Sequence, residues 1–137
     1  GLAAEQLIQT TTDFEEAMTA TDMLIEAIPE SLEMKQDLFR RADALLKERA
    51  ILATNTSGLS ITEIGQVTNR PDRVIGMHFF NPVKAMPLVE VVRGEKTSDE
   101  TITRTCALAL ALGKTPVVTR DVRPHALVLG NPARRQS

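Results

Sequence analysis

Short apolar runs alternate along this chain with segments of helical periodicity, and this alternation is the strongest constraint on its fold. The predicted strands cover residues 23–28, 51–57, 74–80, 87–94 and 115–121. Amphipathic segments separate most of them, such as residues 31–49, where Leu38, Phe39 and Ala42 recur at helical spacing. Strands that alternate with helices indicate right-handed crossovers and a largely parallel sheet. We therefore predict an α/β fold.

One connection departs from this alternation. The third and fourth predicted strands are joined by NPVKAM, residues 81–86, without a helix. Such a short link favours an antiparallel or mixed pair near the C-terminal end of the sheet. Three helices are expected to begin at capping pairs, in which Ser or Thr precedes Glu by three residues: Thr12 and Glu15, Ser60 and Glu63, Thr97 and Glu100.

Size and composition predict one soluble globular domain and exclude several classes of partner. The chain has 137 residues, of which 42% are hydrophobic and 25% charged. A net charge of -2 and the absence of Trp and Tyr argue against nucleic-acid or anionic-membrane binding. No apolar run approaches the roughly 20 residues that cross a bilayer. The single cysteine, Cys106, reads as a small buried apolar residue, and we expect a reducing, cytoplasmic location.

The segment HFFNPVKAMPLVE contains the best candidates for acid–base chemistry, His78 and Glu90. Histidine titrates near neutral pH, which suits proton transfer, but a histidine on an apolar strand is also often a satisfied core residue. Glu90 lies among Leu and Val residues, where an unpaired carboxylate is costly, so a nearby imidazole would suit it. Alternatively, Glu90 faces solvent on an edge strand. Spacing alone leaves both readings open.

Other polar residues follow the predicted strands at their carboxyl ends, where ligands bind in open α/β sheets. Ser57 can donate a hydrogen bond to a substrate oxygen, or it is an ordinary loop serine. Lys35 can reach an anionic ligand, or it lies on a solvated helix face. No His, Cys, Asp or Glu spacing is typical of a metal site, so we expect no metal.

Four segments, in this order, closely resemble the NAD-binding domain of 3-hydroxyacyl-CoA dehydrogenases: IEAIPESLEMKQDLF, ILATNTSGLSITEI, RVIGMHFFNPVKAMPLVEVVRG and DETI…ALGKTPVV. HFFNP followed by LVEVV is the most specific element, and the likeness runs from about Thr10 to Asp121. Relatives include the dehydrogenase part of the multifunctional fatty-acid oxidation protein and 3-hydroxybutyryl-CoA dehydrogenase. The resemblance implies a Rossmann-type, doubly wound sheet and NAD-dependent oxidation of (3S)-3-hydroxyacyl-CoA to 3-oxoacyl-CoA, in fatty-acid β-oxidation or butanoate metabolism.

The resemblance also implies roles for individual residues. His78 matches the catalytic base and Glu90 its partner. Ser57 and Asn81 match substrate-binding positions, and Ser57 also borders the cofactor. The remaining matched positions lie beside the nicotinamide half of NAD: Ala27, Glu30, Lys35 and Asn55. In such a reaction the substrate hydroxyl gives its proton to the histidine, and NAD supplies the hydride chemistry.

Two departures from the family pattern bear on domain organisation. The family begins with a strand, a GxGxMG turn and a helix, so we expect here a partial Rossmann-type domain that lacks the first βαβ unit. After Asp121 the likeness fails. We therefore expect a partial NAD-binding domain over residues 1–121 and a divergent, irregular tail over residues 122–137, in which His125 has no catalytic role.

Two functional hypotheses follow from the sequence. The first is an oxidoreductase fragment that uses NAD and an acyl-CoA substrate, from a family whose full-length members are expected to form homodimers. The alternative is a non-catalytic, truncated Rossmann remnant that binds a partner or has lost cofactor binding. The sequence leaves open the acyl chain-length preference and the oligomeric state of this chain.

Overall fold

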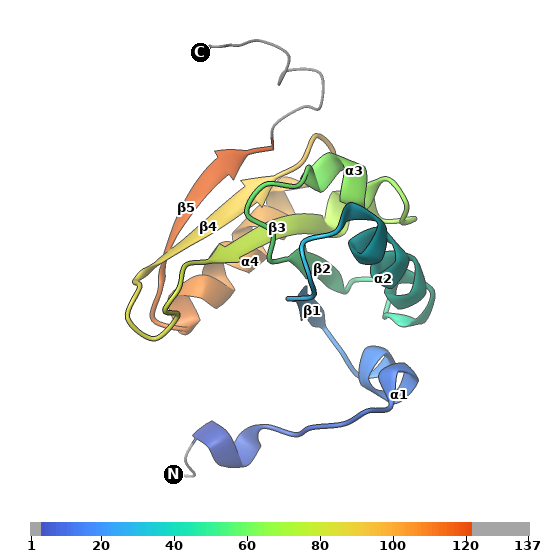
Figure 1. The fold of residues 1–137 in the computed structure, drawn as a ribbon, viewed down its shortest axis with the longest axis horizontal. Helices are drawn as coiled ribbons and strands as arrows, with labels where there is room; N and C mark the ends of the chain where they lie inside the picture. The colour runs from blue at the N-terminus through green and yellow to red at the C-terminus, as the bar shows by residue number, and fades with distance from the viewer. Residues whose placement is uncertain (1–3, 122–137) are drawn as a thin grey trace.

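The computed structural model of the chain describes residues 4–121 (Figure 1). The helices and strands follow the predicted alternation: α1 (Phe14–Thr19), β1 (Met23–Glu26), α2 (Leu32–Leu45), β2 (Ile51–Thr54), α3 (Ile61–Gly65), β3 (Val74–Phe79), β4 (Leu88–Arg93), α4 (Asp99–Ala111) and β5 (Thr115–Arg120). Two short 3₁₀ turns, Ala4–Leu7 and Pro71–Arg73, complete the described elements. The predicted tail, residues 122–137 with His125, lies outside the described residues.

The five strands form one sheet in chain order, from β1 to β5. β1, β2 and β3 run parallel, β4 pairs antiparallel with β3, and β5 runs parallel to β4. The prediction of a mostly parallel α/β sheet with one mixed pair near the C-terminal end is therefore confirmed. Helix-containing crossovers connect the parallel neighbours, whereas the helix-free link after β3 turns the chain back on itself.

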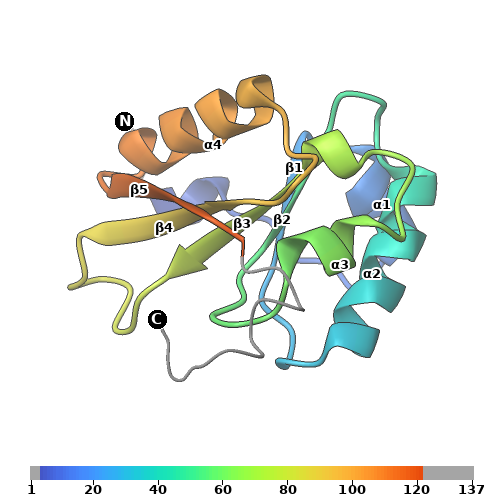
Figure 2. The same cartoon turned by 90° about the horizontal axis from the view of Figure 1, so that it is seen from above.

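Helices cover the two faces of the sheet unequally (Figure 2). α4 lies on one face, where Val89 and Val91 pack in a core with Ala109. α2 and α3 lie on the other face over β1–β3, with Phe39 and Leu52 in a second core. On that second face, α3 reaches only the end of β4, where Val92 packs against the second core, and none of the described helices covers β5 (Figure 2). A stretch of sheet beside the end of β3 is thus left open.

Local caps fix where the first and third helices begin. Ser60 caps α3 as predicted, because its side chain accepts a hydrogen bond from the backbone N–H of Glu63. The prediction that Thr12 caps α1 was wrong. Asp13 does so, accepting from the N–H of Glu16 at 3.0 Å. Two adjacent polar residues can both fill a cap, and the carboxylate also complements the partial positive charge of the helix N-terminus.

The last helix likewise begins one residue later than predicted. Ser98, not Thr97, caps α4. The hydroxyl of Thr97 instead donates to the carbonyl of Val74 and accepts from the N–H of Gly94, both at 2.8 Å. Thr97 therefore ties the loop after β4 to the start of β3. Gly113 follows the helix with φ +79°, a conformation that glycine adopts without strain.

The sheet has two open edges in the described part of the chain. β1 pairs only with β2, and β5 only with β4. The segment before α1 runs away from the sheet (Figure 1), which leaves Leu7 and Ile8 exposed. Over residues 4–121 we find no helix with the length and apolar character needed to cross a membrane.

Candidate active site

Six of the eight predicted site residues line one pocket at the carboxyl ends of β1, β2 and β3. The pocket has a volume of about 250 Å³. Its lining includes Ala27, Glu30, Asn55, Ser57, His78 and Asn81. The parallel direction of these three strands brings together residues that lie up to 54 positions apart in the sequence, from 27 to 81. Of the other two predicted residues, Lys35 is fully buried, and Glu90 lies on β4, outside this pocket's lining.

His78 and Glu90 face each other across the antiparallel pair of β3 and β4. They are direct partners in the strand register, so their side chains project from the same face of the sheet. The distance from His78 Nδ1 to Glu90 Oε1 is 3.5 Å. Nδ1 is nevertheless buried without a hydrogen-bond partner, because the alignment does not meet hydrogen-bond geometry. The two side chains therefore face each other closely but without a hydrogen bond.

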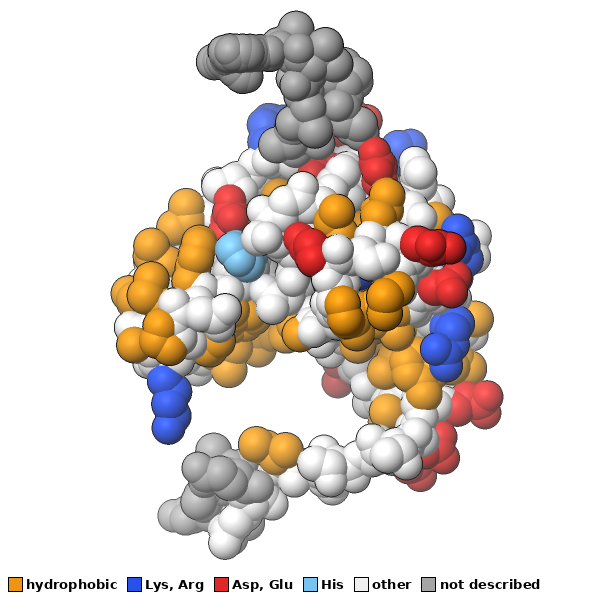
Figure 3. Space-filling view, in the orientation of Figure 1, with side chains coloured by type: hydrophobic (Ala, Val, Ile, Leu, Met, Phe, Trp, Pro, Cys, Tyr) orange, Lys and Arg blue, Asp and Glu red, His pale blue; other side chains and the backbone are white. Residues whose placement is uncertain are grey.

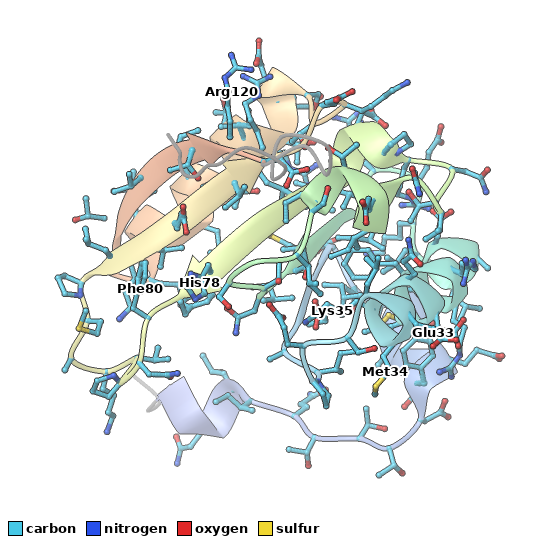
Figure 4. All side chains as sticks on the ribbon, turned by 45° about the horizontal axis from the view of Figure 1, so that its top comes forward. Glu33, Met34, Lys35, His78, Phe80 and Arg120 are labelled. Carbon is cyan, nitrogen blue, oxygen red and sulfur yellow. The ribbon has the colours of Figure 1, made fainter. Side chains whose placement is uncertain are left out.

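The imidazole of His78 is held in place by its neighbours. Phe80, two residues on, stacks against it with ring centroids 4.6 Å apart and planes inclined at 55°. Figure 4 shows the two rings side by side at the end of β3. The His78 side chain is only 20% exposed. One ring nitrogen thus faces Glu90, while the ring borders the pocket.

Thr119 on β5 completes this group, and sequence reasoning missed it. Its hydroxyl donates a hydrogen bond to Glu90 Oε2 at 2.9 Å. Glu90 lies opposite Val117 in the parallel register with β5, and Thr119 is two residues further along on the same face. No sequence signal marks this contact, because it depends on the strand register.

Glu30 accepts several hydrogen bonds from the loop that carries Ser57. Its Oε2 accepts hydrogen bonds from the hydroxyl of Thr56 at 2.6 Å and from the N–H groups of Ser57 and Gly58 at 3.2 and 3.3 Å. Burial raises the pKa of Glu30, but these hydrogen bonds, with the nearby charge of Lys35, outweigh it and hold the pKa below the ordinary glutamate value. Glu30 is therefore an anion that fixes the backbone beside the pocket.

Lys35 does not lie on a solvated helix face, so that reading of the sequence was wrong. Its side chain is completely buried, and its ammonium donates to Glu26 Oε1 at 2.7 Å and Oε2 at 2.8 Å. It also donates to the carbonyl of Ile28 at 3.2 Å and lies 3.9 Å from Glu30 Oε1. Lys35 therefore contacts Glu30, which lines the pocket, and does not line the pocket itself. Figure 4 shows it inside the molecule, away from His78.

Glu26 is a second residue that sequence reasoning left unassigned. Its side chain is 1% exposed and is satisfied by the Lys35 ammonium, the Ile28 N–H and the hydroxyl of Thr54. A buried carboxylate at a strand end with a lysine nine residues later, on the next helix, is the signal that could have revealed it. This network locks the end of β1 onto α2 beneath the pocket.

Asn55 helps to hold the strand ends at a fixed separation. Its Oδ1 accepts a hydrogen bond from the backbone N–H of Phe79 at 3.1 Å, which links the end of β2 to the end of β3. This link fixes His78 relative to the loop that carries Ser57. Asn81 follows β3 and is exposed at the mouth of the pocket.

An apolar groove adjoins the pair on the open face of the sheet. It has a volume of about 190 Å³ and is lined by Phe80, Leu88, Val89, Glu90, Val117 and Thr119. Figure 3 shows hydrophobic side chains gathered on the β4–β5 side of this face. Leu88 and Val117 are 41% and 44% exposed, so apolar surface lies next to the acid–base pair.

A larger pocket lies elsewhere, between α3 and the loop after β4. It has a volume of about 380 Å³, and its lining includes Thr62, Gln66, Gly94, Lys96 and Thr97. It has no histidine in its lining, so the chemistry favours the smaller strand-end pocket, which contains His78. Residues 4–121 contain no cluster of three His, Cys, Asp or Glu side chains that could hold a metal ion.

Comparisons with known proteins point to one family. The profile of a family described as 3-hydroxyacyl-CoA dehydrogenase, NAD binding domain, matches residues 3–122. A fatty acid oxidation complex subunit alpha from Psychrobacter sp. (strain PRwf-1) is 52% identical over 101 residues. That match covers 74% of this chain and 14% of the relative, so the chain spans about a seventh of the relative's length.

Solved structures extend the likeness to the fold. The (S)-3-hydroxybutyryl-CoA dehydrogenase of Ralstonia eutropha matches with a TM-score of 0.76 and 44% identity, over 79% of this chain and 38% of the other. FadB2 of M. tuberculosis matches with a TM-score of 0.82 and 37% identity, over 87% of this chain and 42% of the other. The sheet described above is thus a Rossmann-type dehydrogenase sheet, as expected.

The described residues fit the nicotinamide half of NAD. Ala27 leaves room in the strand-end pocket, and Glu30 offers carboxylate oxygens that can accept from ribose hydroxyls. For the pyrophosphate, residues 4–121 contain no glycine-rich turn at the start of a helix, so the fit concerns the nicotinamide half alone.

Proposed function

The chain belongs to the family of 3-hydroxyacyl-CoA dehydrogenase NAD-binding domains, and on this basis we propose that it acts in the oxidation of (3S)-3-hydroxyacyl-CoA to 3-oxoacyl-CoA. The observation that carries the proposal is the facing pair of His78 and Glu90, 3.5 Å apart on adjacent strands. His78 lines a pocket whose lining also includes Ser57 and Asn81. These groups suit the removal of a hydroxyl proton.

Each residue has a distinct role in the proposed reaction. His78 accepts the proton of the substrate hydroxyl at Nε2, the ring nitrogen that does not face Glu90. Glu90 orients the ring through Nδ1 and stabilises the positive charge that the imidazole gains. Ser57 donates its hydroxyl to the reacting oxygen, and Asn81 holds the substrate at the mouth of the pocket. NAD⁺, when bound, would supply the hydride acceptor for the carbon that bears this hydroxyl.

The proposed cofactor contacts divide into direct and indirect ones. Ala27, Glu30, Asn55 and Ser57 border the space for the nicotinamide and its ribose. Lys35 acts through Glu30, because its ammonium is buried and lies 3.9 Å from that carboxylate. The position of Glu30 in the pocket thus depends on the buried charge of Lys35 beneath it.

The apolar groove supports an acyl substrate. Its position beside Glu90, with Phe80, Leu88 and Val117 in its lining, suits the hydrocarbon part of an acyl thioester. We assign the dehydrogenase function to residues 1–121, in agreement with a family match that ends at residue 122. Self-association of the complete protein and a cytoplasmic location are part of the same proposal, the latter because Cys106 is a free thiol.

The proposal is tested by NADH formation from NAD⁺ and (3S)-3-hydroxybutyryl-CoA with the purified full chain. The parent should form NADH, and His78→Ala should lower kcat by about 10²- to 10⁴-fold, the usual contribution of a positioned base. His125→Ala, which changes the other histidine, is the matched control and should match the parent. Absence of NADH formation by a folded parent, or equal activity in both variants, would overturn the proposal.

A second candidate is a non-catalytic module, and two observations favour it. The described part of the chain presents an unpaired outer edge of β1 and holds no glycine-rich turn for the pyrophosphate. A partner strand could add to that edge. A folded chain that associates through this edge and neither binds NADH nor turns over substrate would support this candidate over the dehydrogenase.

A further inference from the structure

Thr119 on β5 holds the carboxylate that faces the imidazole. Its hydroxyl donates to Glu90 Oε2 at 2.9 Å, while the other oxygen, Oε1, lies 3.5 Å from His78 Nδ1. Three adjacent strands thus contribute one side chain each to a row that runs from hydroxyl to carboxylate to imidazole. The row lies on the open face of the sheet, beside the apolar groove.

Glu90 needs such a support because little else restrains it. Its side chain is 33% exposed and has three rotatable bonds. Among the described residues, Thr119 is the only side chain that donates a hydrogen bond to it. Threonine is β-branched and therefore stiff in a strand, so its hydroxyl is a fixed anchor. A carboxylate tied at one oxygen presents the other in a constant direction.

We propose that Thr119 is a positioning residue, which selects the Glu90 rotamer that faces His78 and thereby keeps the Nδ1–H tautomer of the imidazole. That tautomer leaves Nε2 as the lone-pair acceptor on the pocket side. The inference rests on the proposed function, because orienting the ring matters for catalysis only if His78 and Glu90 act as the acid–base pair. The inference adds β5 to the two strands, β3 and β4, that carry the pair, and thus makes β5 part of the site.

The imidazole ¹⁵N spectrum of His78 in the full chain tests the inference without turnover. In the neutral ring, the two ¹⁵N shifts report which nitrogen carries the proton. The parent should show mainly the Nδ1–H form, and Thr119→Val, which removes the hydroxyl at constant shape, should show a mixture. Thr119→Ser should restore the parent spectrum. Thr115→Val is the matched control on the same strand and face, and it should leave the spectrum unchanged.

Kinetics with the same variants supply the second readout. Thr119→Val should lower kcat by about 10- to 100-fold with little change in KM, as expected when one hydrogen bond to a charged group is lost. Thr119→Ser and Thr115→Val should stay within about twofold of the parent. If Thr119→Val does not fold, Thr119→Ala removes the same hydroxyl, and its effect can be measured with the same ¹⁵N spectra of His78.

The two readouts separate this inference from the proposed function. A tautomer change in Thr119→Val without any turnover by the parent would support the positioning role and contradict the dehydrogenase. Turnover that depends on His78, with unchanged spectra and unchanged kcat in Thr119→Val, would overturn the positioning role and leave the dehydrogenase standing. Equal effects of the changes at Thr119 and Thr115 would also overturn it, since a general strand effect would then explain both.

Discussion

The buried ion pair of Lys35 and Glu26 gives the sharpest stability prediction. Both side chains are almost fully buried, and the ammonium donates to both carboxylate oxygens. Lys35→Met keeps the length of the side chain but leaves the carboxylate of Glu26 without its counter-charge. The loss of one partner from a buried pair costs about 3–5 kcal/mol.

The structure favours the lower end of that range. Glu26 keeps two hydrogen bonds in the variant, from the Ile28 N–H and the hydroxyl of Thr54. We therefore expect a loss of about 3 kcal/mol, a large part of the total for a domain whose stability is typically 5–15 kcal/mol. A fully apolar pair, Glu26→Leu with Lys35→Met, should recover most of the loss, because no uncompensated charge remains.

Urea unfolding followed by far-UV circular dichroism measures the effect, since the chain has no Trp or Tyr for fluorescence. Lys47→Met is the matched control. Lys47 likewise forms an ion pair, with Asp22 at 2.9 Å, but both of these side chains are more than half exposed. Lys47→Met should therefore shift the urea midpoint only slightly. Equal midpoint shifts for Lys35→Met and Lys47→Met would refute the reasoning from burial.

Two further predictions concern Glu30 and the glycines. The pKa of Glu30 is lower in the folded chain than in the unfolded one, so its contribution to stability is present above the ordinary glutamate pKa and is lost as the pH falls through the folded value. In the Glu30→Gln variant, the urea midpoint should decrease less than in the parent as the pH is lowered. A decrease equal to that of the parent would contradict this prediction. Gly76→Ala should cost about 1–3 kcal/mol, because its new Cβ would lie 2.8 Å from both Ile61 Cδ1 and Val92 Cβ. Gly58→Ala meets nothing within 4 Å and should be nearly neutral in the same urea assay, so equal costs would refute the packing argument.

The order and type of the elements could be predicted because each strand is a nearly continuous apolar run. The antiparallel turn of β4 was also predictable, since NPVKAM leaves no room for a helix. The exact helix starts were not, because Thr12 and Asp13, or Thr97 and Ser98, are adjacent residues that can each cap. Local sequence shows that a cap is present but not which neighbour forms it.

The site was predictable as a set of strand ends but not as a set of contacts. Resemblance pointed to His78 and Glu90, yet their facing register and the support from Thr119 depend on how three strands align. Lys35 looked like a surface lysine because it lies in a polar stretch of helix. Its partner, Glu26, ends the preceding strand, and only the packing of α2 onto the sheet joins them.

A double-mutant cycle on kcat/KM tests most directly whether His78 and Glu90 act as one acid–base device. The four proteins are the parent, His78→Gln, Glu90→Gln and the double variant, assayed with (3S)-3-hydroxybutyryl-CoA and NAD⁺. If the glutamate acts only through the imidazole, the double variant should lose no more activity than His78→Gln alone. Losses that multiply across the two sites would mean that the residues act independently, and they would contradict the account.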